Sequence, residues 1–305
     1  MAIDSLYCAY LKAYHTYEFY EVLLQVFSDK GKKDKVQALK QEMLVAFGIK
    51  EGEYKFGVDN RHFAADKEKG VIQPSLLSIK GFSQSCADDL YKLSQTEHFD
   101  TFYDLLKRLK SVSSVDRSRL DTLIRIGYFD CFGPTLTLLN IVELFDKYYG
   151  KKQIKKDKND IPLEILSKYS TETNAMFKIS DNDALVRELC SMIPKKELPL
   201  EARLKAQYDT YGYISYTDPS RPNTAVIMDL NTKYSTFRAQ LYRLYDGQII
   251  TVKVKKKTYE QMPIAVGMVI NYRTDKQPAW KMDENGKWQK DYSREDTWLS
   301  SYTIN

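Results

Sequence analysis

The chain has 305 residues, 43% of them hydrophobic and 29% charged, an ordinary composition for a globular protein of two or three domains. No apolar run approaches the roughly 20 residues of a membrane-spanning helix, and Met1 leads directly into an amphipathic segment rather than a signal peptide. The net charge of +5 leans mildly toward a polyanionic partner. We expect a cytoplasmic protein with no membrane partner.

The four cysteines lie far apart without a C-x-x-C pair, and the three histidines are scattered. This spacing disfavours a zinc site built from sequence-local ligands. Reduced, structural cysteines are the better interpretation for a cytosolic chain. No Gly-rich phosphate loop or nucleophile elbow is visible either, so we expect no catalytic residue, no metal and no cofactor in this chain.

Residues 5–27 carry apolar side chains at alternating steps of four and three, which places them on one stripe of a helix. Thr16 can N-cap a second helix within this stretch. We interpret the stripe as core packing. A further helix begins near Asp34 and ends at Gly48. The stripe consists of Leu6, Tyr10, Ala13, Tyr17, Tyr20, Leu24 and Phe27.

Residues 51–72 contain short apolar pieces between glycines and charged turns, a pattern typical of small strands or an irregular loop. Arg61 lies in this stretch, close to the start of the segment that follows. It is a candidate phosphate contact, although a solvated arginine is the simpler interpretation.

Residues 74–93 have the pattern of a helix-hairpin-helix, in which an apolar turn and a tight hairpin at residues 80–83 precede a helix with an apolar face. Because Gly81 lacks a Cβ, the chain can turn sharply there and a phosphate can approach the main-chain N–H groups. The positive end of the next helix points the same way, and Lys80 adds a mobile cation. Such a device holds a DNA backbone without reading its bases. The alternative is an ordinary corner between two helices with a C-cap glycine.

Start signals and apolar spacing predict three more helices between residues 99 and 145, the second ending at Gly127 and the third opening at Pro134. The lysine-rich run at residues 150–160 is interpreted as a solvated linker or mobile loop. Residues 161–209 have a helical pattern broken at prolines.

From Tyr211 onward the hydrophobic period changes to two, with hairpin signals at Asp246-Gly247 and at residues 283–286. About five short strands in this stretch predict a small β-barrel of the oligonucleotide-binding (OB) kind. Its aromatic and lysine side chains are candidates for contact with a single strand, although half of the aromatics should belong to the core. The candidates are Tyr234, Phe237, Tyr242, Lys253, Lys255, Lys256 and Lys257.

Four segments in the same order resemble the C family of bacterial replicative DNA polymerases, the α subunits of DNA polymerase III. The segment at residues 10–20 is similar to the end of the family's fingers, and Ile79-Lys80-Gly81 is similar to its hairpin. Residues 123–133 and 204–215 are similar to two later motifs, the last of which precedes the family's OB domain. Ser83 stands where a second hairpin glycine is common, which implies a different phosphate geometry.

The resemblance implies an α+β fold, mainly helical in its N-terminal two-thirds and followed by an OB-like barrel. The implied parts are the end of the fingers (1–73), a helix-hairpin-helix DNA-binding region (74–150), a linker and helical region (151–210) and the OB-like β domain (211–305). The implied contacts with duplex phosphates are Lys80, Gly81, Phe82, Ser83, Gln84 and Arg61.

The resemblance further implies that the palm aspartates, which hold two Mg²⁺ ions in the full polymerase, lie upstream. We therefore expect the chain to be inactive alone as a nucleotidyltransferase. The implied partners are primer-template duplex, single-stranded DNA, the remaining polymerase domains, a sliding clamp and other replisome subunits. The alternative function is a non-catalytic replication scaffold that binds protein partners such as the clamp.

Overall fold

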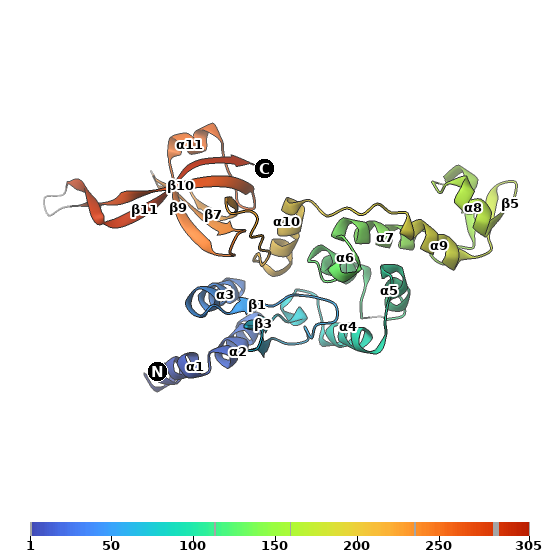
Figure 1. The fold of residues 1–305 in the computed structure, drawn as a ribbon, viewed down its shortest axis with the longest axis horizontal. Helices are drawn as coiled ribbons and strands as arrows, with labels where there is room; N and C mark the ends of the chain where they lie inside the picture. The colour runs from blue at the N-terminus through green and yellow to red at the C-terminus, as the bar shows by residue number, and fades with distance from the viewer. Residues whose placement is uncertain (1, 113, 159, 235, 283–286, 305) are drawn as a thin grey trace. The chain divides into compact units, whose positions relative to one another are not determined.

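The computed structural model describes residues 2–112, 114–158, 160–234, 236–282 and 287–304. It confirms an α+β fold in which helices dominate the first two-thirds and a five-stranded barrel follows (Figure 1). The chain forms two compact units. The first unit comprises Met1–Thr16, Val26–Glu51 and Leu200–Asn305, and the second comprises Tyr17–Gln25 and Gly52–Pro199. The four-part division expected from the sequence stays a prediction.

The second unit is built mostly from short helices around an aromatic cluster. Phe56 lies at ring-centroid distances of 5.7–6.2 Å from Tyr128, Phe129 and Phe132. Helices α4 to α7 supply most of the surrounding core. The elements are β2 (Ala64–Asp66), β3 (Val71–Gln73), η1 (Leu76–Ser78), α4 (Gln84–Thr96), α5 (Phe102–Leu109), α6 (Arg117–Arg125), η2 (Asp130–Phe132), α7 (Thr135–Tyr148), β4 (Gln153–Lys155), η3 (Lys156–Lys158), α8 (Leu163–Tyr169), β5 (Ser170–Glu172), β6 (Met176–Ile179) and α9 (Asn182–Ser191).

Local sequence fixes where these helices begin and end. Ser83, Thr101 and Asp116 have extended backbones, and their side chains accept hydrogen bonds from the first turn of α4, α5 and α6. Helix α6 ends at Arg125, and Gly127, two residues further on, has a φ of +87°. The Tyr128 N–H then donates to the Leu123 carbonyl, the bond typical of a Schellman C-cap.

The lysine-rich segment is not a linker or loop throughout. Its residues Gln153–Lys155 form β4, which pairs antiparallel with β6 in a sheet of order β4-β6-β5. Ile154 pairs with Phe177, and both side chains are buried. One apolar residue among the lysines therefore anchors the segment, a signal too short to register as a strand period.

The first unit contains the barrel and the helices α1 and α3, with α2 shared between the units. In the barrel, β10, β11, β9, β8 and β7 pair in that order, and β7 returns to β10 to close the ring. The elements are α1 (Ala2–Tyr14), α2 (Thr16–Asp29), α3 (Lys33–Phe47), β1 (Lys50–Glu51), α10 (Leu200–Tyr211), β7 (Thr224–Asn231), β8 (Phe237–Arg243), β9 (Ile249–Val254), α11 (Lys256–Gln261), β10 (Val269–Met282) and β11 (Trp288–Ile304).

The barrel has the OB-like arrangement that the sequence predicted. Strand period explains its core, because Phe237, Ala239 and Leu241 point inward from β8 while Arg238 and Gln240 are exposed. The Asp246-Gly247 turn joins β8 to β9, with Gly247 at a φ of +71°. The other expected hairpin, at residues 283–286, lies outside the described residues.

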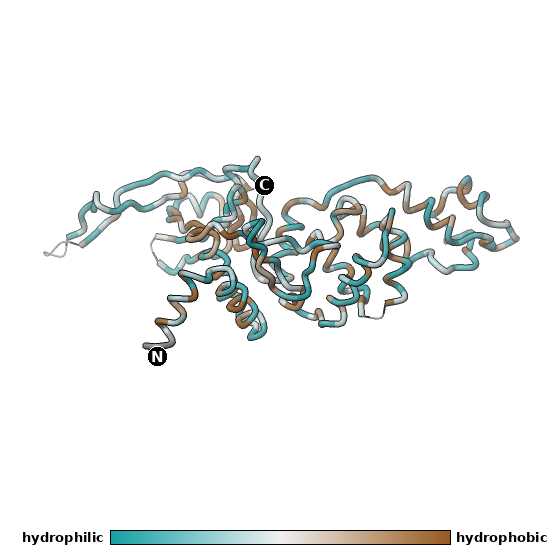
Figure 2. The backbone as a smooth tube through the Cα atoms, turned by 60° about the horizontal axis from the view of Figure 1, so that its bottom comes forward, coloured by the Kyte–Doolittle hydropathy of each residue, from teal (hydrophilic) through white to brown (hydrophobic). Residues whose placement is uncertain are grey.

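The interpretation of the N-terminal stripe as core packing is wrong for α1. Leu6 and Tyr10 are 71% and 52% exposed, Ala13 is exposed as well, and α1 contributes brown segments to the tube near the N-terminus (Figure 2). The interpretation holds for α2, where Tyr20 and Leu24 are buried. Helical spacing identifies an apolar face but cannot say whether anything covers it.

Candidate nucleic-acid interface

The predicted hairpin is a tight turn at residues 79–82. The Phe82 N–H donates to the Ile79 carbonyl over 3.2 Å, and Gly81 has a φ of +91°, as the third position of a type II turn requires. A Cβ at Gly81 would meet no described atom within 4 Å. Glycine is therefore needed for the backbone conformation, and its exposed side is open to a ligand.

Several amide groups around this turn have no protein acceptor. Ser83 N-caps α4, its Oγ accepting from the Cys86 N–H at 3.4 Å, and the first helical main-chain bond runs from Ala87 to the Ser83 carbonyl. The N–H groups of Gly81, Ser83, Gln84 and Ser85 donate to no acceptor in the part of the chain that the structure describes. Together with the positive end of α4, they form a group of donors suited to an anion.

Arg119 of α6 holds the opposite side of the turn. Its Nε donates to the Gly81 carbonyl over 2.8 Å, and its Nη1 donates to the Ser114 carbonyl over 3.0 Å. It also pairs with Asp116 at 3.0 Å. Because the Gly81 carbonyl accepts this hydrogen bond, the peptide unit between Gly81 and Phe82 is held in one orientation. Sequence reasoning missed Arg119, because the contact joins residues 38 apart and no local pattern marks it.

Asn60 supports the approach to the turn and was also missed. Its side chain is buried; Nδ2 donates to the carbonyls of Glu53 and Pro74 at 3.0 and 2.9 Å, and Oδ1 accepts from the Lys55 N–H at 3.1 Å. The Leu76 N–H donates to the Asn60 carbonyl. Asn60 thus ties the loop before the turn to Pro74 and Leu76, which lead into the turn. In the sequence, only the turn-forming pair Asp59-Asn60 marks this position.

The charges around the turn are modest. Lys80 is exposed and makes no ion pair with the acids that the structure describes. Arg61 pairs with both carboxylate oxygens of Asp59 at 2.9 and 2.7 Å, and its guanidinium lies 4.3 Å from the Tyr91 ring centroid. The hydrogen bonds from Arg61 hold the pKa of Asp59 below its ordinary value. Arg61 is therefore positioned over α4, but its charge is balanced.

The remaining hairpin candidates are also placed. Phe82 is half-buried and Ser83 is exposed, with an extended backbone (φ −114°, ψ 161°) that serine adopts without strain. Gln84 is exposed and donates to Asp88 over 2.9 Å.

In the barrel, the single-strand candidates are divided. Phe237 and Tyr242 are 8% and 3% exposed and belong to the core, so neither ring can stack on a base in this conformation. Tyr234 is 68% exposed. Lys253 pairs with Asp296 at 2.5 Å and Lys256 with Glu260 at 3.7 Å, while Lys255 and Lys257 are exposed.

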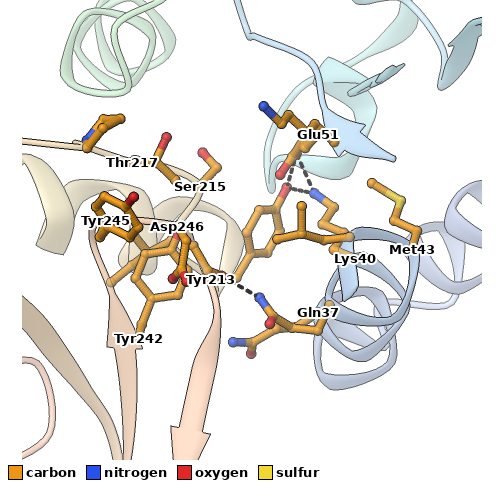
Figure 3. A pocket seen from close by; sticks show the side chains of 16 residues that line it. Gln37, Lys40, Met43, Glu51, Tyr213, Ser215, Thr217, Tyr242, Tyr245 and Asp246 are labelled. Carbon is orange, nitrogen blue, oxygen red and sulfur yellow. Dashed lines mark hydrogen bonds and ion pairs between the residues drawn. The ribbon is translucent and has the colours of Figure 1, made fainter. Parts of the chain in front are cut away.

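A pocket of about 230 Å³ lies between α3 and the barrel within the first unit (Figure 3). Buried Lys40 donates to Glu51 over 2.5 Å and to the Tyr213 hydroxyl, and desolvation lowers its pKa. The neighbouring Gln41 donates to the Gly247 carbonyl over 2.9 Å and accepts from the Ile249 N–H over 3.2 Å. These contacts attach α3 to the β8–β9 turn.

The Mg²⁺ ions that the resemblance implies for a whole polymerase require a group of carboxylates. Among the residues that the structure describes, no three His, Cys, Asp or Glu side chains form a group that could hold a metal ion. The described residues therefore do not fit such a site.

None of the described helices is both long and apolar enough to cross a membrane.

Comparison with known proteins places the turn in a familiar setting. Residues 44–137 match the family model of the helix-hairpin-helix motif, a range that contains Asn60, Gly81 and Arg119. The chain is also 30% identical over 146 residues to the DNA polymerase III subunit alpha of Ureaplasma parvum serovar 3. That match covers 47% of this chain but only 15% of the relative's length. The two matches confirm the resemblance that the four sequence motifs indicated.

Proposed function

We propose that this chain is a DNA-binding region of a replicative DNA polymerase α subunit. The single observation that carries the proposal is the group of unpaired main-chain donors at Gly81, Ser83, Gln84 and Ser85, within a segment that matches the helix-hairpin-helix model. Donors of this kind bind phosphate oxygens, which every DNA sequence presents alike. The chain then grips the duplex without regard to its bases.

In this proposal Lys80 supplies the mobile charge beside the amides, and Arg61 is a second cation whose charge Asp59 partly offsets. The OB-like barrel approaches single-stranded template through its exposed side chains, among them Tyr234, Lys255 and Lys257. The remaining polymerase domains and other replisome subunits are the protein partners. Nucleotidyl transfer itself belongs to residues other than those described.

The test is a salt titration of binding to a labelled primer-template duplex. Lys80→Ala with Gly81→Val removes the cation and places a branched Cβ at a positive φ, where it is strained. The variant should bind duplex at least tenfold more weakly, with a salt slope smaller by about one. Lys92→Ala, an exposed lysine at the other end of α4, is the matched control and should keep parental affinity.

Unchanged duplex affinity of a folded Lys80→Ala, Gly81→Val variant would remove the hairpin from the interface. That result would favour the scaffold alternative, in which protein partners rather than DNA occupy these surfaces. Circular dichroism of both variants establishes that the helices are intact.

A further inference from the structure

Strands β10 and β11 extend beyond the barrel as a two-stranded arm (Figure 1). Strand β7 pairs with β10 only at residues 269–271, and β9 pairs with β11 only at Trp298 and Leu299. Among the described residues, those at 276–282 and 288–297 pair only with each other, ending at Met282 opposite Trp288. Neither of the two core clusters of the barrel includes a residue from these two stretches.

One face of the arm tip is aromatic. Trp280 is paired with Lys290 and Met282 with Trp288, and residues directly opposite on paired strands share a face. Tyr292 lies beyond these pairs, at a break in the register where residues 292–294 have no partner on β10. The exposed fractions are 54% for Trp280, 56% for Met282, 62% for Trp288 and 79% for Tyr292. Rings of this size left in solvent together indicate a binding surface.

Charge separates the two faces. On the opposite face, Ala279 is paired with Asp291 and Lys281 with Gln289. Lys281 lies 3.8 Å from Asp291, so the negative charge of Asp291 is offset on the face opposite the aromatic side chains. The aromatic face carries Lys290 as its cation. A row of flat rings with a cation suits the bases and phosphates of a nucleic acid.

The base of the arm leads to the barrel surface already proposed for single strands. Asp275 is paired with Trp298, Trp298 with Lys253, and Lys253 with Arg238, in one row across three strand pairings. Lys253 Nζ lies 5.8 Å from the Trp298 ring centroid, and Arg238 is exposed. Arg238 is the second residue of β8, which follows the loop that carries Tyr234. In OB-type barrels, this loop and the connection between the fourth and fifth strands are the ones that hold oligonucleotides.

We infer that the aromatic face of the β10–β11 arm binds single-stranded DNA by stacking bases on Trp280 and Trp288, with Lys290 near the phosphates. This inference rests on the proposed function and assigns it a second contact site. Stacking tolerates any base, because every base has a flat face. The contact should depend on salt less than the duplex contact does, because one lysine carries its charge.

The sequence offers a direct probe, because its three tryptophans, Trp280, Trp288 and Trp298, all lie on β10 and β11. Titration of the whole chain with an oligothymidylate should quench the intrinsic fluorescence as bases stack. Trp280→Ala with Trp288→Ala should weaken binding of the labelled oligonucleotide at least tenfold and abolish most of the quenching. Tyr245→Ala removes a half-exposed ring at the other end of β8 and should change affinity less than twofold.

The inference is overturned if the double tryptophan variant binds the oligonucleotide within twofold of the parent, or if the oligonucleotide binds without quenching. The two proposals fail separately. Loss of duplex binding in the Lys80→Ala, Gly81→Val variant, with full single-strand affinity in the arm variant, rejects the arm alone. Unchanged duplex binding in the Lys80→Ala, Gly81→Val variant, with weakened single-strand binding in the arm variant, rejects the hairpin contact and supports the arm contact.

Discussion

Arg119 Nε lies 2.8 Å from the carbonyl oxygen of Gly81. The contact joins the first turn of α6 to the bend before α4 and fixes the peptide unit at the glycine. This unit carries the Phe82 N–H, which donates to the Ile79 carbonyl, so holding it fixes the turn that lies between the unpaired N–H groups of Gly81 and Ser83. Arg119 is thus a positioning residue for the proposed phosphate site, and it is only 28% exposed.

Arg119→Ala should weaken duplex binding about threefold to tenfold, because loss of one charge-assisted hydrogen bond loosens the turn. If Arg119 acts through Gly81, the salt slope of binding stays at the parental value; a slope smaller by about one would mean direct phosphate contact. Arg117→Ala is the matched control from the same helix turn, since Arg117 pairs with Asp146 and does not touch the bend.

Ser83→Ala should lower the free energy of unfolding by about 1 kcal/mol, because α4 loses its N-cap acceptor, whereas Ser83→Gly should cost only a few tenths. Both changes keep the main-chain N–H, and glycine also accepts the extended backbone of Ser83. Thermal or denaturant unfolding gives the stability. Duplex affinity equal to that of the parent in Ser83→Gly is expected, and a large loss would mean that the hydroxyl itself contacts DNA.

Asp59→Asn should strengthen duplex binding and steepen its salt dependence, because Arg61 keeps its place over Tyr91 while losing the carboxylate that balances its charge. The pH dependence has a defined sign. Because the pKa of Asp59 is depressed in the folded chain, the Asp59–Arg61 pair stabilises the fold at pH values above the ordinary carboxyl pKa. This stabilisation is lost as the pH falls through the folded-state pKa of Asp59. Binding assays at fixed salt compare Asp59→Asn with Asp66→Asn, an acid paired with Lys69 in the same loop region. A weaker complex for Asp59→Asn would exclude Arg61 from the interface.

Sequence patterns predicted what depends on nearby residues. The positive φ at Gly81, the helix start at Ser83 and the turn at Gly247 follow from the conformational limits of single residues. The barrel core follows from a strand period of two, which buries Phe237 and leaves Arg238 exposed.

The patterns could not predict contacts that join distant residues. Neither the Arg119–Gly81 bond nor the buried partners of Asn60 have a local signature. Exposure of an apolar face is equally invisible, which is why the α1 stripe looked like core. The arm was missed for a related reason: alternation marks Trp280 and Trp288 as strand residues but does not reveal that the strands outrun the barrel.

Lys40→Met should lower the free energy of unfolding of the first unit by about 3–5 kcal/mol, because it leaves Glu51, whose side chain is only 12% exposed, without its cation. Lys40→Met combined with Glu51→Gln should recover part of that loss, since the remaining groups are neutral. The double-mutant cycle, measured by denaturant unfolding, gives the coupling of the pair. Additive effects of the two changes would show that Lys40 and Glu51 do not stabilise each other.

The lowered pKa of Lys40 adds a pH test with a fixed sign. Between the folded pKa and the ordinary lysine value of 10.5, the unfolded chain binds more protons than the folded chain. The free energy of unfolding therefore rises with pH in that window through this group. The difference in free energy of unfolding between the parent and Lys40→Met removes the contribution of the other titrating groups. This difference should increase in favour of the parent as the pH rises toward 10.5. An advantage that stays constant or narrows would mean that Glu51 and Tyr213 hold the lysine charged as firmly as water does.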